Sequence, residues 1–368
     1  MNKKLVAVAI AGLLAAPLAQ AQTANVTLYG RANLSMVFVN GTKPDGTNPN
    51  VYRVDSNSSR FGIRGTESLG GGLNAIFQIE NGSINMSSTG GALAGRDTFL
   101  GLSGGWGKVY LGFYSAPYDM VTNLQGSNTA NTGILGTGIL WAQASQSITS
   151  GGFDSRLSNS IRYDSPTMAG FSGSAQFSTG EGSPSSNTNQ QSYALNYANG
   201  PFSAIVAAEF HNNTRGVVNQ SLDDSAWSIA AQWQFSMFNI AGTYEWLNYD
   251  APTATSTNGA SLKRKYWQIN SSIKAGANGE VYLMYGSAGN GTGSAANGYT
   301  VGQLTKGSDT GASNWQVAYK YHLSKRTYVY TGYQKVNNDD NAAYNGSFNS
   351  IRKGANPGGF SMGMLHNF

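Results

Sequence analysis

Several arginines occupy strand-like segments in which they alternate with apolar side chains. Arg60 and Arg64 flank the pair Phe61 and Ile63, and Arg162 has an apolar residue on each side. A β-strand sends successive side chains to opposite faces, so these arginines share the face that the apolar residues avoid. The guanidinium group stays charged at any working pH and offers its donors in a planar fork. Arginines gathered along a narrow aqueous path would attract anions and oppose cations.

Catalytic chemistry has little support in this chain. The three histidines, His211, His322 and His366, do not form a recognisable arrangement with serine and a carboxylate for nucleophilic catalysis. Spacings typical of metal sites are also lacking. The glycine run at 70–72 falls in a predicted turn, and not at the strand-to-helix junction that a phosphate loop needs. We therefore expect no catalytic residue, no metal site and no cofactor, and an enzyme is the weakest alternative.

The first residues read as an export segment. Lys3 and Lys4 precede an apolar run at 5–18, and Ala19-Gln20-Ala21 fits the small-x-small rule for cleavage. This pattern predicts a signal peptide over 1–21 and a single domain over 22–368. The chain contains no cysteine, so a fold formed after export closes without disulfides. Its formal net charge of +5 is small and scattered, which argues against nucleic acid as a partner.

Beyond the leader, the chain is built from alternating segments of about 8 to 12 residues, near the length of a tilted membrane strand. About sixteen can be counted, and representative ones lie at 26–39, 73–80, 171–177, 227–235 and 315–323. No apolar run after the leader reaches the roughly 18 residues of a membrane helix. If the chain spans a bilayer, it must do so as strands closed into a barrel, because lipid leaves no partner for an open edge.

The connections alternate between tight and long. Tight ones rich in Gly, Asn or Pro occur at 104–107, 198–201, 275–279 and 323–326, whereas long polar ones lie near 40–57, 81–95, 115–156, 179–190, 212–224, 249–264, 288–313 and 337–358. Eight long loops and seven short turns predict an all-β, sixteen-stranded antiparallel transmembrane barrel. The short turns would face the periplasm and the long loops the exterior.

A soluble β-sandwich is the main structural alternative to this barrel. Aromatic residues near strand ends, such as Tyr193, Tyr197, Tyr244 and Trp246, suit the interfacial girdles of a membrane barrel better. The opposite parity carries Arg, Lys and Glu, which suits a wet lumen and not a second dry face.

The final segment shows the same alternation. Phe360, Met362, Met364 and Phe368 fall on one parity, with small or polar residues between them. Phe368, at the lipid-facing parity of this strand, resembles the C-terminal signal that the barrel-assembly machinery reads in outer-membrane barrels. The simpler interpretation is that Phe368 only anchors the strand at the interface.

Several motifs in combination resemble the trimeric porins of Gram-negative bacteria of the neisserial and burkholderial type. The resemblance rests on NVTLYG at 25–30, SRFGIRGTESLGGGL at 59–73, and the segments 101–104, 159–163, 197–201 and 323–327. It implies a homotrimer in the outer membrane, with passive diffusion of small hydrophilic solutes and ions through each barrel. It also implies that the third long loop folds inward and narrows the pore.

The same resemblance places the family's basic wall cluster on Arg60, Arg96 and Arg156, with Arg64 and Arg162 at lumenal parity. The third long loop carries no charge between Asp119 and Asp154, so an acidic eyelet is mostly missing. We expect these seven residues to form the constriction and to give a weak preference for anions. The competing interpretation is that the arginines pair with carboxylates such as Glu80 and Asp97 and only brace the wall.

The expected partners are outer-membrane lipid and lipopolysaccharide, the barrel-assembly machinery during biogenesis, and small solutes and anions. A substrate-specific porin is one alternative, since Tyr29, Tyr110, Tyr282 and Tyr330 have inward parity. A surface adhesin or receptor that uses the long loops is another. Conductance in a lipid bilayer separates a pore from an adhesin or an enzyme.

Overall fold

The computed structural model describes residues 25–41, 43, 45–47, 50–82, 95–126, 133–144, 152–180, 188–215, 222–252, 259–348 and 351–368. The leader predicted at 1–21 lies outside the described residues, as does the predicted start of the domain. No helix among the described residues is long and apolar enough to cross a membrane.

The described chain is almost entirely β-structure, with three short 3-10 helices in one long connection. The strands are β1 (Asn25–Asn40), β2 (Val51–Ser56), β3 (Arg60–Gly70), β4 (Leu73–Asn81), β5 (Thr98–Gly104), β6 (Gly107–Ser115), β7 (Arg156–Asp164), β8 (Phe171–Thr179), β9 (Asn189–Asn199), β10 (Phe202–Asn212), β11 (Asp223–Gln234), β12 (Asn239–Ala251), β13 (Ala260–Ala275), β14 (Gly279–Ala288), β15 (Thr300–Val301), β16 (Leu304–Thr305), β17 (Ala312–His322), β18 (Thr327–Asn338) and β19 (Gly358–Asn367). The helices are η1 (Pro117–Asn123), η2 (Gly133–Leu135) and η3 (Trp141–Ala144).

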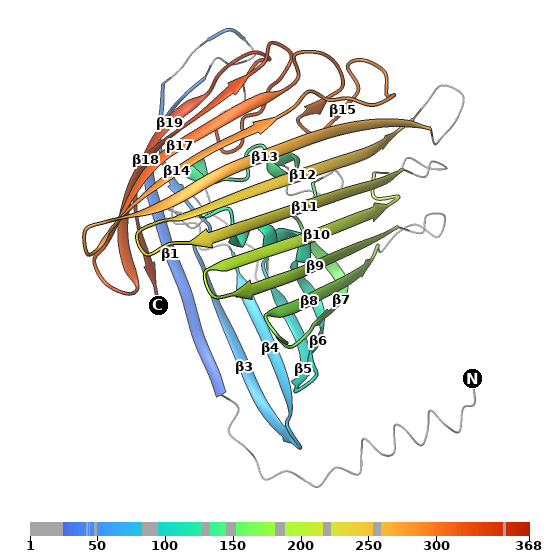
Figure 1. Ribbon diagram of the computed structural model, residues 1–368, viewed down its shortest axis with the longest axis vertical. Coiled ribbons are helices and arrows are strands. Elements are labelled where there is room, and N and C mark those ends of the chain that lie inside the picture. The colour runs from blue at the N-terminus through green and yellow to red at the C-terminus, as the bar shows by residue number, and fades with distance from the viewer. Residues whose placement is uncertain are drawn as a thin grey trace.

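The main sheet closes on itself. Successive strands of this sheet pair antiparallel, except that β2 and β3 both pair with β1; β14 pairs with β17, because β15 and β16 form a separate small sheet. β19 returns to pair with β1 from Arg31–Asn367 to Asn40–Gly358. In Figure 1 the blue β1 and the red C-terminal end lie side by side. This closure leaves no open edge between the first and last strands, which is what a lipid environment requires.

Seventeen hydrogen-bonded segments make up the sheet, but they form a barrel of sixteen strands. The difference arises because β2 and β3 both pair with the same side of β1 and together act as one barrel strand. β2 pairs with its outer half and β3 with its inner half. The break falls at 57–59, where Ser58 adopts a left-handed φ of 55° and the Ser59 hydroxyl accepts the amide of Asn33. The predicted sixteen-stranded antiparallel barrel is therefore confirmed.

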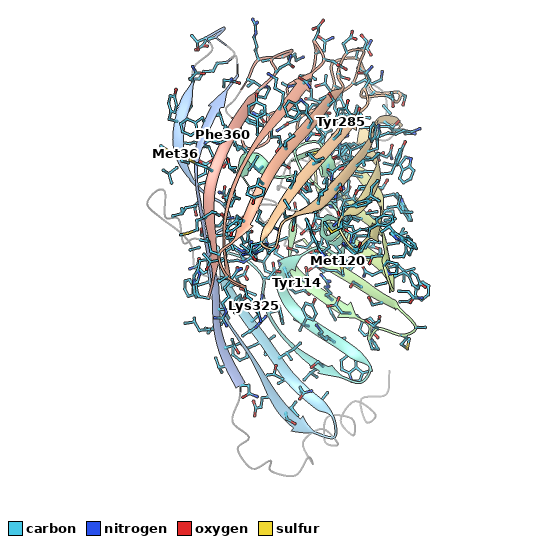
Figure 2. All side chains as sticks on the ribbon, turned by 60° about the vertical axis from the view of Figure 1, so that its left-hand side comes forward. Met36, Tyr114, Met120, Tyr285, Lys325 and Phe360 are labelled. Carbon is cyan, nitrogen blue, oxygen red and sulfur yellow. The ribbon has the colours of Figure 1, made fainter. Side chains whose placement is uncertain are left out.

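The wall has an apolar outer face and a polar inner face, as the alternation predicts. In β1, Leu28 and Met36 are exposed, and Figure 2 shows Met36 on the outer side of the wall. Asn33 and Ser35 on the other parity are buried inside the barrel. The same arrangement recurs in β11, where Trp227 and Ile229 are exposed and Ser228 is buried.

Some strands extend further than the sequence suggests. The connection expected near 249–264 shrinks to 252–259, because β12 continues to Ala251 and β13 begins at Ala260. In β13 the buried Leu262, Arg264 and Tyr266 alternate with the exposed Lys263 and Lys265. The segment 260–266 resembles a loop in sequence because its outward side chains are polar. Its inward side chains are nevertheless buried inside the barrel, as in a strand.

The third long connection, between β6 and β7, folds into the barrel. Its helix η1 contacts the inner side of β8 to β11, η2 contacts β18 and β19, and η3 contacts β12. Buried apolar residues of this connection, Tyr118, Val121, Ile134, Leu140 and Trp141, belong to a core that lies inside the barrel. The inward-folded third loop is therefore confirmed.

Candidate functional site

Three of the arginines expected in the constriction lie together on the inner wall. Glu80 on β4 binds two of them, with its Oε1 2.5 Å from Nε of Arg96 and its Oε2 3.7 Å from Nε of Arg60. Asp97 binds the third, with Oδ1 2.7 Å from Nε of Arg156. Arg96 lies within electrostatic range of both Arg60 and Arg156. The pairing interpretation is thus partly right, yet cations outnumber carboxylates.

A fourth arginine joins this group. Arg31 on β1 stands directly opposite Arg60 on β3 and feels the charges of Arg96 and Glu80. Its Nε donates to Asn367 Oδ1 at 3.4 Å, and no ion pair joins it to any described carboxylate. Arg31 was not among the arginines expected in the cluster, although its parity in the first strand indicates an inward direction. We call Arg31, Arg60, Arg96 and Arg156 the arginine wall.

The arginine wall carries a net positive charge. Four guanidinium groups face two carboxylates, Glu80 and Asp97, so two positive charges are uncompensated. Tyr29 also donates its hydroxyl to Glu80 Oε2 at 3.0 Å, which holds that carboxylate on the wall. The arginine side chains are only partly buried, which leaves them in contact with water.

Arg64 and Arg162 lie apart from the arginine wall. Arg64 is exposed, and its guanidinium carbon stands 4.9 Å from the centre of the Tyr29 ring, nearer the short-turn end of β3. Arg162 pairs with Asp164 at 2.8 Å and donates to the carbonyl of Ser115 at 3.0 Å. Arg162 therefore braces the start of the third long connection.

Asp119 and Asp154 both belong to the third long connection. Asp119 in η1 lies within electrostatic range of Arg156, Asp97 and Arg96, so it is close to the Arg156 end of the arginine wall. Burial raises the pKa of Asp119 to about 6. Burial, followed by the charge of Asp119, raises the pKa of Asp154 well above its usual range. Asp154 Oδ1 is buried and has no hydrogen-bond partner among the described residues.

One wall residue holds two distant points of the third connection. Glu245 on β12 accepts the Tyr118 hydroxyl and the Ala142 amide through Oε1, each at 2.8 Å. Its Oε2 pairs with the Arg264 guanidinium at 2.9 Å, and both side chains are fully buried. Tyr118 also stacks on Trp141, with ring centres 5.3 Å apart. Glu245 was not expected at the site, because the sequence of β12 does not show which residues of the third connection contact an inward carboxylate.

Further hydrogen bonds fasten the rest of the connection to the wall. Gln316 donates to the carbonyl of Leu135 at 2.8 Å, and the Tyr282 hydroxyl donates to the carbonyl of Gln125 at 2.8 Å. The Ser192 hydroxyl accepts the Tyr118 amide at 2.9 Å. The connection is therefore bonded to β9, β12, β14 and β17, whereas the arginine wall is built on β1, β3, β7 and the segment just before β5.

The inward tyrosines do not line an open path. Tyr110, Tyr282 and Tyr330 are 7%, 0% and 4% exposed, and only Tyr29 is partly accessible. The Tyr330 hydroxyl donates to Asn33 and Tyr110 donates to Asp164. Their hydroxyls are therefore used within the wall. Within the described ranges no group of three or more His, Cys, Asp or Glu side chains could hold a metal ion.

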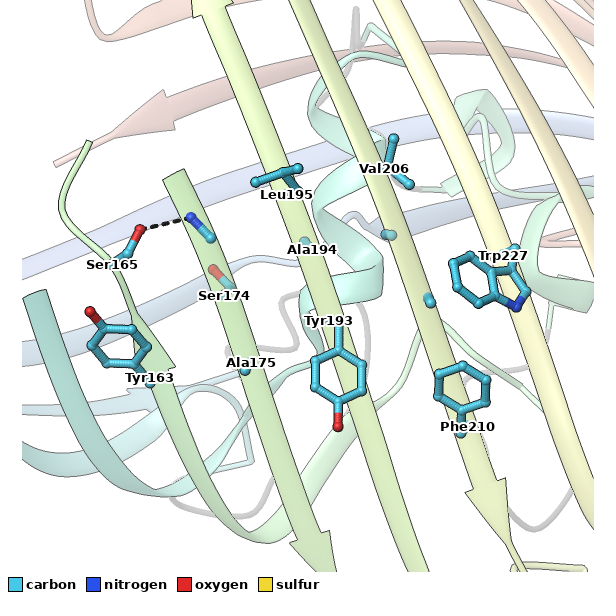
Figure 3. Close-up of a pocket in the computed structure, with 13 residues that line it drawn as sticks. Tyr163, Ser165, Ser174, Ala175, Tyr193, Ala194, Leu195, Val206, Phe210 and Trp227 are labelled. Atoms are coloured by element: carbon cyan, nitrogen blue, oxygen red, sulfur yellow. Dashed lines mark hydrogen bonds between the residues drawn. The ribbon is translucent and has the colours of Figure 1, made fainter. Parts of the chain in front are cut away.

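A depression of about 470 Å³ lies on the wall at β8 to β11. Figure 3 shows Tyr193, Leu195, Val206 and Trp227 around it, and all four are exposed. Small residues such as Ala175 and Ala208 form its floor. The lining is almost wholly apolar and faces away from the arginine wall, so this depression is a feature of the outer surface and not of the channel.

Comparison with protein families matches residues 6–341 to the model described as Gram-negative porin. The chain is 30% identical to major outer membrane protein P.IB of Neisseria gonorrhoeae over 67% of this chain and 68% of that protein. It is 26% identical to outer membrane porin protein 32 of Delftia acidovorans over 92% of this chain and 91% of that protein.

Solved structures share the fold. The anion-selective porin from Comamonas acidovorans superposes with a TM-score of 0.76 at 24% identity, covering 94% of this chain and all of that one. OmpT of Vibrio cholerae, solved in a trimer form, gives a TM-score of 0.64 at 14% identity, covering 94% of this chain and all of that one.

Proposed function

The chain belongs to the Gram-negative porin family, and on that premise we propose that its channel prefers anions through the arginine wall. As a member of this family it lies in the outer membrane and forms a water-filled channel for passive diffusion of small hydrophilic solutes and ions. The observation that carries the preference is the uncompensated charge of Arg31, Arg60, Arg96 and Arg156 opposite a nearly uncharged loop.

The physical argument concerns local potential. A narrow path with low-dielectric walls focuses the field of its fixed charges. The Debye length is about 8 Å at physiological salt, so a passing ion feels the wall only where the path is narrow. Asp119 opposes this field when charged, and it is the described loop carboxylate within reach of Arg156. The preference should therefore be weak and should depend on salt.

The similar fold of the anion-selective porin from Comamonas acidovorans supports this proposal without establishing it. We favour a general channel over a substrate-specific one, because three of the four inward tyrosines are buried, with their hydroxyls bonded to the wall or to the third long connection. Nothing in the arrangement of the arginine wall requires a catalytic role, so diffusion is the proposed activity.

We also propose that the barrel assembles as a homotrimer, because a related fold has been solved in a trimer form. Outer-membrane lipid and lipopolysaccharide would surround its apolar outer face, and the barrel-assembly machinery would insert it. Phe368 is the proposed assembly signal, and Arg60, Arg64, Arg96, Arg156, Arg162, Asp119 and Asp154 remain the proposed constriction, with Arg31 added.

The test is the reversal potential of the purified protein in a neutral planar bilayer under a KCl gradient. We expect an anion-preferring potential for the wild type. In R60Q/R96Q/R156Q, Glu80 and Asp97 lose their partners but keep their charges. The ratio of chloride to potassium permeability should fall by roughly sevenfold, because about one kT of local potential acts in opposite directions on the two ions. The channel should then prefer cations.

Two variants serve as controls. K274Q/R352Q/K353Q removes the same charge from exposed sites outside the arginine wall and should leave the potential unchanged. E80Q/D97N removes the opposing charges and should raise the anion preference. Conductance with an unaltered reversal potential in the arginine variant would refute the proposal while leaving the channel itself established.

A further inference from the structure

The eighth long connection, between β18 and β19, turns back into the mouth of the barrel. Its residues Ala342, Tyr344 and Phe348 are buried. They belong to the same interior core as Ile134 and Ile139 of the third long connection. An outer loop surrounded by water would leave such apolar side chains exposed. The buried part of the eighth connection therefore packs on the protein that lies below it in the barrel.

Apolar contacts join the eighth connection directly to the third. Gly346 lies against Ile139, because a Cβ on Gly346 would stand 2.6 Å from Ile139 Cγ1. The side chains of Phe348 and Ile134 converge at the start of β19, where each has an atom 3.0 Å from the position of a Cβ on Gly359. In close-packed protein, a shift of one of these connections either carries the other with it or opens a void between them.

A further contact involves the ion pair that anchors the third connection. The Tyr344 ring lies over Arg264, whose guanidinium carbon is 5.8 Å from the ring centre. A cation at this distance is attracted to the face of an aromatic ring. Arg264 pairs with Glu245, which accepts hydrogen bonds from two points of the third connection. Tyr344 therefore extends the anchor of the third connection to the outer loop.

The eighth connection is itself fixed by hydrogen bonds. Asn338 at the end of β18 donates through Nδ2 to the carbonyls of Tyr344 and Ala355, at 3.0 Å and 2.7 Å, and its Oδ1 accepts the Tyr344 amide at 2.8 Å. Gln303, in the seventh long connection between β14 and β17, donates to Asn345 Oδ1 at 2.9 Å and accepts the Asn345 amide at 3.2 Å. The part that contacts the third connection is therefore held in place by the wall and by a neighbouring loop.

We propose that Tyr344, Gly346 and Phe348 are positioning residues for the constriction, and that the third connection is held between them and Glu245 on the wall. The width and steadiness of the channel then depend on the eighth connection, and a displacement of this outer loop reaches the constriction through Ile139 and the ion pair of Glu245. The sign of the ion preference belongs to the arginine wall. This inference therefore goes beyond the proposed ion preference and does not depend on it.

The experiment is single-channel recording of the full-length folded protein in a neutral planar bilayer. G346A adds a methyl group that must displace Ile139, so the open-channel current noise should rise roughly twofold as this packing is disturbed. The matched control is G298A in the seventh connection. Gly298 also has a left-handed φ, 84° against 48° for Gly346, but a Cβ there would have no atom within 4 Å. G298A should therefore leave the current unchanged.

A second substitution tests whether the contact with Ile139 is the cause. I139A removes the three atoms nearest to the added methyl group. The double variant G346A/I139A should consequently be no noisier than I139A alone. Undiminished noise in the double variant would overturn the proposal, because strain in the backbone of the eighth connection would then be its source.

Y344L and Y344F test the contact with Arg264 and decide alone if G346A does not insert. Y344L removes the ring from the guanidinium and should raise the noise, whereas the conservative Y344F keeps the ring and should restore the quiet current. The temperature of unfolding is measured for every variant, because a merely structural role would lower it without changing the current. Equal noise in G346A and G298A, or in Y344L and Y344F, would overturn the proposal.

Discussion

At the scale of single residues, the channel depends on how charges are shared among neighbours. Arg60 and Arg96 share the single carboxylate of Glu80, whereas Arg31 has an amide and no ion pair among the described residues. A wall with fewer carboxylates than arginines carries a net positive charge. Asp119 in η1, within electrostatic range of Arg156 and Arg96, can change this balance, because burial raises its pKa to about 6.

The anion preference should rise as the pH falls through about 6. Burial raises the pKa of Asp119 to about 6, so this carboxyl is charged above that pH and neutral below it. Its negative charge opposes Arg156 and Arg96, and protonation removes that opposition. The measurement is the reversal potential between pH 7.5 and pH 5 in bilayers of neutral lipid. The charged groups around it are Arg156, Arg96, Asp97, Glu209 and Asp154.

The D119N variant separates Asp119 from the other groups. It should show at pH 7.5 the stronger anion preference that the wild type reaches only in acid. D154N tests the neighbouring carboxyl, whose pKa is also raised. A pH profile of D119N that retains the full step near pH 6 would assign the step to another group.

Sequence parity predicted some of these residues and missed others for a physical reason. Arg60 and Arg64 alternate with apolar residues within one strand, so their inward direction follows from period two. Arg96 and Arg156 sit at the boundaries of β5 and β7, where alternation gives no direction. Arg96 pairs with Glu80, 16 residues earlier in the chain, and Arg156 pairs with Asp97, 59 residues earlier. A local sequence pattern does not show which residues of distant segments will lie side by side in the barrel.

At the scale of elements, the third long connection is held by polar contacts and not by its own structure. Its helices η1, η2 and η3 have at most 7 residues each, too few to be stable alone. Glu245 fixes two points that lie far apart in this connection, Tyr118 and Ala142. A buried carboxylate with three partners gives geometry that apolar packing alone would not specify.

Removing this anchor should widen or destabilise the constriction. E245A alone would leave the buried Arg264 without its ion-pair partner. Such a change typically lowers the free energy of unfolding by about 3–5 kcal/mol. The double variant E245L/R264M removes both charges and keeps the volume apolar, so we expect the barrel to fold. Its single-channel conductance should be larger and its open-channel current noisier than in the wild type.

Y118F provides a graded comparison. It removes one hydrogen bond to Glu245 at a cost of about 1 kcal/mol and keeps the ion pair with Arg264. We expect only a small rise in current noise. A conductance and noise spectrum of E245L/R264M identical to the wild type would mean that the other wall contacts position the connection unaided.

The elements themselves were largely predictable, with errors where strands leave the membrane. The alternation of apolar and polar residues located the barrel strands, because one face of each strand must contact lipid. It failed at 249–264, where the outward residues Lys263 and Lys265 are polar and only the inner parity is buried. Likewise 51–56 was expected within a loop, yet β2 pairs with β1 there. Where a strand extends beyond the bilayer, its outer face contacts water and can be polar, so the apolar–polar alternation that identifies a membrane strand is lost.

At the scale of the whole molecule, the barrel exists only if its first and last strands meet. The register from Arg31–Asn367 to Asn40–Gly358 makes this seam, and Phe368 extends it by one residue. Gly30 donates to the Phe368 carbonyl at 2.9 Å and accepts its amide at 3.0 Å. A Cβ on Gly30 would meet the Phe368 ring, so glycine there is required by close approach.

Deleting Phe368 should lower the amount of protein in the outer membrane several-fold while leaving refolding of the purified chain into detergent nearly unchanged. The seam keeps ten residue pairs without Phe368, so two lost hydrogen bonds do not decide whether the barrel closes. Recognition during assembly, by contrast, would depend on the terminal aromatic. F368W should restore the outer-membrane level, whereas F368A should not. Parallel losses in the cell and in detergent would mean that Phe368 acts through the stability of the seam alone.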